Sequence, residues 1–272
     1  MQWDRVKSIL LVILLLVDGF LLAGLAGRYI MTEWRQRTLL EDIEIVLARY
    51  EVTCGEGLRI PEQRNMIALE ADRSRPAEEA FAEAVLTGTV QRTEREDGQT
   101  VFEGDNGTVR WQPDGTVYAA FTPKDTDMPG TAGEMKKAAT ALFTECGVSL
   151  TGGTLKADLE RGTVTLTVPI AGMPVFNRSL TTTWKGEGQI TLEGQWFFGM
   201  PYATTADRER LCSAEDALLQ VARGASGQGK VGRIDSIALG YRIDNGAGAR
   251  LQLLPYWRVQ TDKGAVFVDA LK

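Results

Sequence analysis

The sequence predicts an α+β protein: an N-terminal transmembrane helix followed by two extracytoplasmic domains of antiparallel sheet with packed helices. Three observations support this class. The first is an apolar run at residues 8–27 with a single charged member. The second is a repeated change from helical to strand periodicity, and the third is a set of turn dipeptides between short strand segments. The roughly 240 residues after the run suffice for one large or two small domains.

The apolar run is the predicted anchor, residues 8–28, after a cytoplasmic tail of residues 1–7. About twenty helical residues span about 30 Å, the thickness of a hydrocarbon core. Asp18 costs about 3 kcal/mol at the bilayer centre, and the apolar residues around it outweigh that cost. Positive charges on both sides leave the orientation open, but a short tail before the span favours a cytoplasmic N-terminus. A cleaved signal peptide and a buried helix remain alternatives.

An acid inside a membrane normally faces other helices or a cavity. We therefore expect Asp18 to lie on a stripe that contacts partner helices. Residues at three-, four- and seven-residue spacings share one face of a helix. The stripe consists of Leu11, Leu14, Leu15, Asp18, Leu21, Leu22 and Leu25. The alternative is that the acid is merely tolerated, because measured insertion penalties are modest.

Residues 32–122 form the predicted first extracytoplasmic domain. Apolar residues recur at helical spacing from 32 to 50, and Ser74 precedes a second amphipathic helix. Strand periodicity then begins, and three dipeptides mark hairpin turns: Asp97-Gly98, Asn106-Gly107 and Asp114-Gly115. We expect a four-stranded antiparallel meander with helices on one face. Residues 123–131, rich in proline, glycine and aspartate, are the predicted linker.

Residues 132–272 form the predicted second extracytoplasmic domain. A helix from about 132 to 146 ends at Gly147, and strand-like segments follow it. Ser213 begins another helix with the S-x-x-D form of a capping box, and this helix is also followed by strands. Because a helix followed by strands occurs twice, we expect a duplicated unit within this domain.

The residue inventory excludes several kinds of chemistry. The chain has no histidine, which removes Ser-His-Asp catalysis, Cys-His catalysis and histidine-ligated metal sites. Cys54, Cys146 and Cys212 lack zinc or thioredoxin spacing, so we expect small buried residues. A net charge of −6 argues against a nucleic-acid partner. We predict no catalytic residue, no cofactor and no metal.

Two further features have competing interpretations. The stretch GASGQGKV, residues 224–231, nearly fits a phosphate-binding loop, but valine replaces the hydroxyl residue and the stretch follows a helix instead of preceding one. We therefore expect a flexible loop there. Aromatic residues are concentrated in the second half, where Trp196, Tyr256 and Trp257 are candidates for partner binding or for the core.

Several stretches together resemble a known family. The opening MQWDRVKSILLVILLLVDGFLL, with its Trp-Asp-x-x-Lys start and interrupted apolar run, resembles the N-terminus of YycI, a family of membrane-anchored regulators from low-GC Gram-positive bacteria. GMPVFNRSLTTTW, GQITLEGQWFFG, SAEDALLQ, IALGYRI and LLPYWRVQTDKGAVFVDALK are similar to later motifs of the same family. The resemblance covers the anchor and residues 131–272, whereas residues 35–125 match only in the order of helices and strands.

The resemblance implies a non-enzymatic regulator of the WalK/WalR cell-wall two-component system. Such a protein is anchored in the cell membrane by one span, with its N-terminus in the cytoplasm. Its implied partners are the transmembrane helices of the sensor histidine kinase WalK, the sister protein YycH and the membrane itself. PepSY and spore-germination proteins share the Pro-Val-Phe and Pro-x-Trp elements, so a regulator of an extracellular lytic enzyme or protease is an alternative.

A membrane-tethered hydrolase is the alternative from a different class of protein. Two carboxyl groups about 5 to 9 Å apart can cleave a glycosidic bond. The candidate pairs are Glu187 with Glu193 and Asp207 with Glu209. Scattered carboxylates are mostly exposed surface residues, however, and that interpretation is the simpler one.

Overall fold

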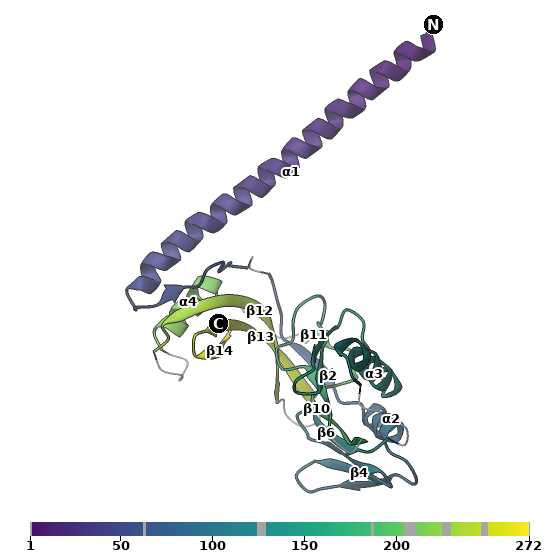
Figure 1. Ribbon diagram of the computed structural model, residues 1–272. Helices are drawn as coiled ribbons and strands as arrows, with labels where there is room; N and C mark the ends of the chain where they lie inside the picture. Colours follow the sequence, from purple (N-terminus) through teal and green to yellow (C-terminus); the bar gives the residue numbers. More distant parts are fainter. Residues whose placement is uncertain are drawn as a thin grey trace. The chain divides into compact units, whose positions relative to one another are not determined.

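The computed structural model describes residues 2–61, 64–123, 129–185, 188–203, 211–224, 230–245 and 250–271 (Figure 1). The predicted α+β class is confirmed, because the described elements form α-helices and two β-sheets. The chain divides into two compact units. The first unit contains Met1–Glu62, Ala214–Ile237 and Val259–Val266. The second contains Gln63–Ser213, Ala238–Arg258 and Phe267–Lys272.

Helix α1 of the first unit spans Gln2–Ala48 as one element of 47 residues (Figure 1). The sequence predicted an anchor and a separate helix beginning at residue 32, and the structure joins them. The junction has no proline, and a glycine such as Gly27 costs only about 1 kcal/mol in a helix. The helix ends where Glu51 adopts a φ of 60° and the Val52 N–H donates to the Leu47 carbonyl at 3.2 Å. This is a left-handed helix termination.

The C-terminal turns of α1 are the part that packs against protein. Ile43 and Leu47 are buried there, and α1 contacts α4, which spans Ala214–Ala222. Leu218 and Val221 of α4 are also buried. In the part of the chain that the structure describes, no helix is both long enough and apolar enough to cross a membrane.

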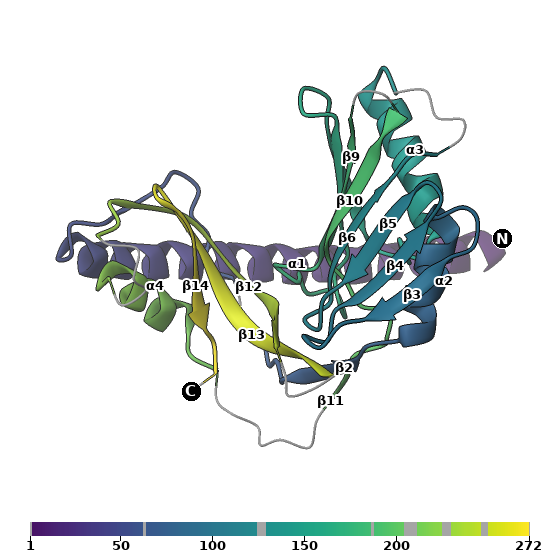
Figure 2. The same ribbon diagram turned by 90° about the horizontal axis from the view of Figure 1, so that it is seen from below.

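The second unit is built around an eight-stranded antiparallel sheet. Its strands are β3 (Gln91–Glu94), β4 (Thr100–Gly104), β5 (Gly107–Trp111), β6 (Thr116–Phe121), β7 (Thr154–Asp158), β8 (Thr163–Thr167), β9 (Ser179–Trp184) and β10 (Ile190–Gln195). Their order is β3-β4-β5-β6-β10-β9-β8-β7. The predicted four-stranded meander corresponds to β3–β6. Helices α2 (Arg75–Val85) and α3 (Ala132–Glu145) cover the same face of the sheet (Figure 2).

This sheet contains a repeated arrangement that differs from the expected duplication. Helix α2 precedes the β3–β6 meander, and α3 precedes the β7–β10 meander. The two meanders join side by side through β6 and β10, with Phe121 opposite Ile190 and Ala119 opposite Leu192. The repeat therefore extends across residues 123–131, which the sequence suggested as a boundary between domains. Strands on both sides of that segment pair in one sheet, so the units divide elsewhere.

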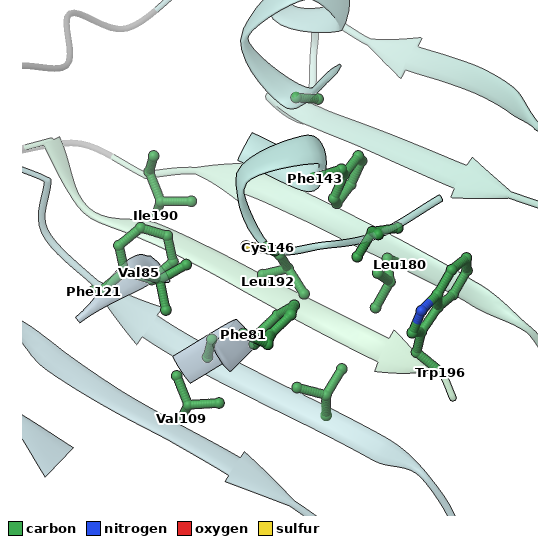
Figure 3. Close-up of a cluster of buried hydrophobic side chains, with 14 of the residues drawn as sticks. Phe81, Val85, Val109, Phe121, Phe143, Cys146, Leu180, Ile190, Leu192 and Trp196 are labelled. Atoms are coloured by element: carbon green, nitrogen blue, oxygen red, sulfur yellow. The ribbon is translucent and has the colours of Figure 1, made fainter. Parts of the chain in front are cut away.

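The hydrophobic core of the second unit lies between this sheet and its two helices (Figure 3). Phe81 of α2 and Phe143 of α3 are completely buried against the sheet residues Leu180 and Leu192. The Phe81 ring meets Trp111 edge to face, with centroids 5.4 Å apart. Burying a large side chain of this kind contributes about 1.5–3 kcal/mol. The helices cover the sheet because each carries one apolar face.

Local capping defines where these two helices begin. The Ser74 side chain accepts a hydrogen bond from the Ala77 N–H at the start of α2, with Pro76 in the first turn. At α3, Thr131 accepts from the Glu134 N–H, and the Glu134 carboxylate accepts from the Thr131 N–H, which completes a capping box. Each cap satisfies backbone donors that the helix cannot satisfy itself.

A second sheet of six strands uses segments from both units. Its path is β1 (Thr53–Cys54), β12 (Arg233–Asn245), β13 (Arg250–Thr261), β2 (Leu69–Asp72) and β11 (Tyr202–Ala203), with β14 (Gly264–Asp269) also paired to β13. β1 pairs with β12 in parallel, and Thr53 lies opposite Arg233. β1 could not be predicted from the sequence, because a strand of two residues is too short to show periodicity. The long strands β12 and β13 supply residues to each unit.

Candidate partner-binding surface

The predicted stripe on α1 is exposed wherever the structure describes its side chains. Leu11, Leu14, Leu15, Leu21 and Leu22 retain between 57% and 66% of their accessible surface, and Asp18 is also exposed. The structure does not describe the side chain of Leu25. No described element of the first unit packs on this stripe. The described side chains of the stripe are thus uncovered in this structure.

The structure separates the three aromatic candidates of the second half. Trp196 and Trp257 are fully buried, so they belong to the core. The Trp257 indole N–H donates to the Cys212 carbonyl at 3.0 Å. Tyr256, the neighbour of Trp257 on β13, points to the opposite face of the strand and is only partly buried. Of the three, Tyr256 alone is placed to meet a partner.

Tyr256 belongs to a group that we call the arginine–aromatic surface. Its members are Phe176, Arg242, Tyr256, Arg258 and Phe267. Arg242 lies on β12, Tyr256 and Arg258 on β13, and Phe267 on β14. Side chains alternate between the two faces of a strand, and the buried strand neighbours of these residues fix this group on the open face. All five lie in the second unit.

Phe176 reaches this surface from outside the named strands. Its N–H donates to the Tyr241 carbonyl at 2.8 Å, and the Tyr241 N–H donates to the Pro174 carbonyl at 2.8 Å. A parallel bridge between Val175 and Tyr241 results, which places the Pro-Val-Phe segment along β12. The close approach explains Gly240, since a Cβ there would lie 2.5 Å from the Pro174 carbonyl oxygen.

Cations and rings alternate across the surface. The Arg242 guanidinium lies 5.2 Å from the Phe267 centroid and 5.6 Å from that of Tyr256. Arg258 lies 5.0 Å from the Phe176 centroid, and the Phe176 and Phe267 centroids are 5.6 Å apart. Exposed cation–π contacts of this type contribute about 0.5–1 kcal/mol each. These contacts place both guanidinium groups against aromatic rings.

The environment of Tyr256 raises the pKa of its hydroxyl above the ordinary value. Burial raises the pKa of its hydroxyl, the nearby carboxylates of Asp269 and Asp244 raise it further, and Arg242 opposes them. At neutral pH this hydroxyl is therefore a neutral donor beside two arginines and two aspartates. Such a surface can recognise a partner through apolar contact, hydrogen bonds and charge. Tyrosine and arginine are enriched at the energetic centres of protein interfaces.

Sequence reasoning identified Tyr256 but not the four residues around it. A signal was present, because Arg242, Arg258 and Phe267 each stand between two apolar residues that face inward. What was missing was the pairing of β12, β13 and β14, which brings the alternating residues together. Phe176 was visible only as part of the Pro-Val-Phe motif.

The other sequence candidates do not form a site in the described residues. Glu193 is exposed on β10, whereas Glu187, Asp207 and Glu209 lie outside the described residues. Among the described residues, no group of three or more His, Cys, Asp or Glu side chains could hold a metal ion. Cys146 and Cys212 are buried, Cys54 is partly buried, and none of the three forms a disulfide bond.

Burial and charge perturb the pKa values of two cysteines. Burial raises the pKa of Cys146 to about 12, with a smaller contribution from Glu145. Burial also raises the pKa of Cys54, and the Glu44 carboxylate adds to that effect. Since the thiolate is the reactive form, neither environment activates a cysteine as a nucleophile.

No protein-family model and no curated protein matches the chain. Among solved structures, the chain is similar to the crystal structure of an uncharacterized protein from Eubacterium rectale. The two are 10% identical, the match covers 80% of this chain and 90% of that one, and the TM-score is 0.46.

Proposed function

We propose that this protein is a membrane-anchored, non-enzymatic regulator that binds a sensor histidine kinase and a YycH-like protein. The arginine–aromatic surface is the observation that carries the proposal for the extracytoplasmic part. It offers preorganised arginines and rings but no arrangement of nucleophile and base. The sequence resemblance to YycI supplies the kind of partner.

The exposed side chains of α1 support the proposed anchor at residues 8–28. Described apolar residues on all sides of this segment remain exposed, from Val17 at 51% to Phe20 at 79%. Each exposed Å² of apolar surface costs about 25 cal/mol in water. Lipid removes that cost for the whole circumference of the helix. An acid in such a segment is favoured where it faces a partner helix, which is the proposed role of Asp18.

Under this proposal the two binding regions have different tasks. The Asp18 stripe contacts the transmembrane helices of the kinase, and the arginine–aromatic surface contacts the exported YycH-like partner. A charged surface of this kind favours rapid, specific association, and its contribution decreases with ionic strength. Co-purification should therefore weaken as the salt concentration is raised.

The test is co-purification of the full-length protein from mild detergent. The parent should recover a sensor kinase and a YycH-like protein, and Arg242→Ala combined with Arg258→Ala should lose the YycH-like protein. Arg110→Ala is the matched control, because Arg110 is an exposed arginine on β5 of the same unit and outside the surface. Recovery of lytic enzymes or proteases instead of a kinase would refute the proposal. Equal recovery by all three proteins would refute the role of the surface.

A further inference from the structure

The first unit contains a cavity where the C-terminal ends of two helices meet. It has a volume of about 450 Å³ and lies just beyond the ends of α1 and α4. Its lining residues are Arg49, Tyr50, Glu51, Ala222, Arg223, Gly224 and Lys230, which we call the basic pocket. All of them belong to the same unit. Cavities of about 300–1,000 Å³ are the usual size for small-ligand sites.

The pocket has more positive than negative charge. Arg49, Arg223 and Lys230 face one carboxylate, that of Glu51, so the lining has a net charge of two positive units. Glu51 forms an ion pair with Lys230. Arg49 makes no ion pair with any residue that the structure describes. Lys263, which donates to the Lys230 carbonyl, adds a further cation beside the pocket.

The helix ends account for only part of this charge. A helix C-terminus carries about half a negative charge, and two such ends meet here. Basic residues just after a helix commonly offset that charge. The lining has a net charge of two positive units, and the two helix ends together carry about one negative unit. About one positive charge is therefore not offset. One cation is therefore left for a ligand.

Arg223 is held in position by an aromatic residue instead of a carboxylate. Its Nε–H donates to the Tyr50 hydroxyl at 3.3 Å, and its guanidinium lies 6.0 Å from the Tyr50 ring centroid. Within the described residues, the other N–H groups of the guanidinium have no hydrogen-bond partner, and its planar fork of donors matches the geometry of phosphate oxygens. Arg223 is thus placed and oriented by Tyr50, and no carboxylate in the described part of the chain pairs with it.

The Glu51 carboxylate lies beside Lys230, in the position that a bound anion would take. Its φ of 60° is a left-handed conformation that non-glycine residues rarely adopt. The hydrogen bond and charge of Lys230 lower the pKa of Glu51, so this carboxylate is ionised at neutral pH. An incoming anion would take over Lys230 and displace the Glu51 side chain into solvent.

From these observations we propose that the basic pocket binds a phosphate group. Gly224 and Lys230 belong to the glycine-rich stretch GASGQGKV, and both line this cavity. Residues 225–229 of this stretch lie outside the described residues, and the stretch follows α4 and precedes β12. The inference therefore rests on the charge, the volume and the Arg223 geometry. The phosphate can belong to a soluble phosphoester or to a lipid headgroup.

Calorimetry on the full-length protein in neutral detergent tests the proposal, with inorganic phosphate and glycerol 3-phosphate as probes. The parent should bind both. Arg49→Ala combined with Arg223→Ala should weaken binding at least tenfold, and Glu51→Gln should tighten it several-fold by releasing Lys230. Arg161→Ala is the control, because Arg161 is a highly exposed arginine of the second unit. Circular dichroism before titration verifies that each variant is folded.

Vesicles of neutral lipid with and without an anionic phospholipid identify the source of the phosphate. Binding of the soluble probes without a vesicle preference supports a soluble phosphoester, and an added preference for anionic vesicles supports a headgroup. Absence of binding by the parent to either probe would overturn the proposal. Unchanged binding by the double variant, or weaker binding by Glu51→Gln, would overturn it equally. The kinase partnership is independent of all these outcomes.

Discussion

Trp257 provides the sharpest test of how the second unit is held together. Its side chain is completely buried on β13, and its indole N–H donates to the Cys212 carbonyl at 3.0 Å. Replacing a buried tryptophan by alanine costs about 3–5 kcal/mol through lost transfer energy and cavity formation. A buried carbonyl without its donor adds about 1–3 kcal/mol, part of which is recovered when water enters the cavity. We expect Trp257→Ala to lower the free energy of unfolding by about 4–6 kcal/mol.

Two further substitutions separate the packing from the hydrogen bond. Trp257→Phe keeps most of the buried ring but removes the donor, so its cost should be about 2 kcal/mol. Tyr256→Phe changes the next residue on the opposite face of β13 and serves as the control. Because Tyr256 is partly exposed, its loss of a hydroxyl should change stability by no more than about 0.5 kcal/mol.

The assay is urea unfolding of the full-length protein in mild detergent, followed by circular dichroism and by tryptophan fluorescence. Coincident transitions by the two probes justify a two-state free energy. A decrease in the free energy of unfolding below about 1 kcal/mol for Trp257→Ala would refute the burial argument, because replacing a buried tryptophan by alanine costs more than that. Equal losses for Trp257→Phe and Trp257→Ala would instead assign the whole effect to the hydrogen bond.

Three other predictions concern charged and titratable groups. Glu78 forms a buried bidentate ion pair with Arg73, in which both N–O distances are 2.8 Å. Glu78→Ala should therefore lower the free energy of unfolding by about 3–5 kcal/mol. Thermal unfolding measures this change, and a decrease in melting temperature of less than about 2 °C would contradict the prediction. Burial raises the pKa of Cys146 from 9.0 to about 12, so its stabilising contribution is complete below pH 9 and is lost as the pH rises towards 12. The stability difference between parent and Cys146→Ala should therefore shrink by up to about 1.4 kcal/mol per pH unit in that window, and a constant difference would contradict the shift. Asp18→Leu should improve membrane insertion but reduce kinase co-purification, whereas Asp18→Asn should retain it; identical recovery with both variants would remove Asp18 from recognition.

Local elements of the fold were predictable because their chemistry is local. The hairpin dipeptides illustrate this: Gly98 and Gly115 both have a φ of 79°, which favours glycine. The preceding aspartates stabilise the same turns, since Asp97 accepts from the Gln99 N–H at 3.0 Å and Asp114 accepts from the Thr116 N–H at 2.8 Å. Each signal and its structural effect lie within a few residues, so sequence reasoning found the turns and the strands between them.

Long-range pairing was not predictable from the same kind of signal. The sequences of β6 and β10 have the ordinary pattern of amphipathic strands. Their periodicity does not indicate that the two strands pair with each other. Gly194 shows why: its φ is 152°, and a Cβ there would lie 1.9 Å from the Ser179 carbonyl oxygen of the neighbouring strand. The reason for this glycine is a contact with another strand, so it becomes visible only after the pairing is known. The arginine–aromatic surface was missed for the same reason.

Three consecutive residues, 176–178, connect that surface to other parts of the second unit. Phe176 lies in the surface itself. The next residue, Asn177, accepts from the Ile243 N–H at 2.8 Å, donates to the Ile243 carbonyl at 2.9 Å and donates to Gln195 at 2.7 Å. These bonds connect β12 to the end of β10 within the second unit. The segment that carries Phe176 is thus bonded to β12 and to the end of β10.

Arg178, the third of these residues, packs against the end of β10 with its guanidinium buried, which is energetically unfavourable. Its guanidinium lies 4.1 Å from the Trp196 ring and 4.4 Å from the Phe197 ring, and it donates to the Phe197 carbonyl at 3.2 Å. Burial lowers its pKa to about 10, and its Nε–H has no partner in the described part of the chain. Two aromatic rings therefore stabilise a buried cation that no described carboxylate neutralises. Because Arg178 follows Phe176 by two residues, these contacts also fix the backbone next to the arginine–aromatic surface against Trp196 and Phe197.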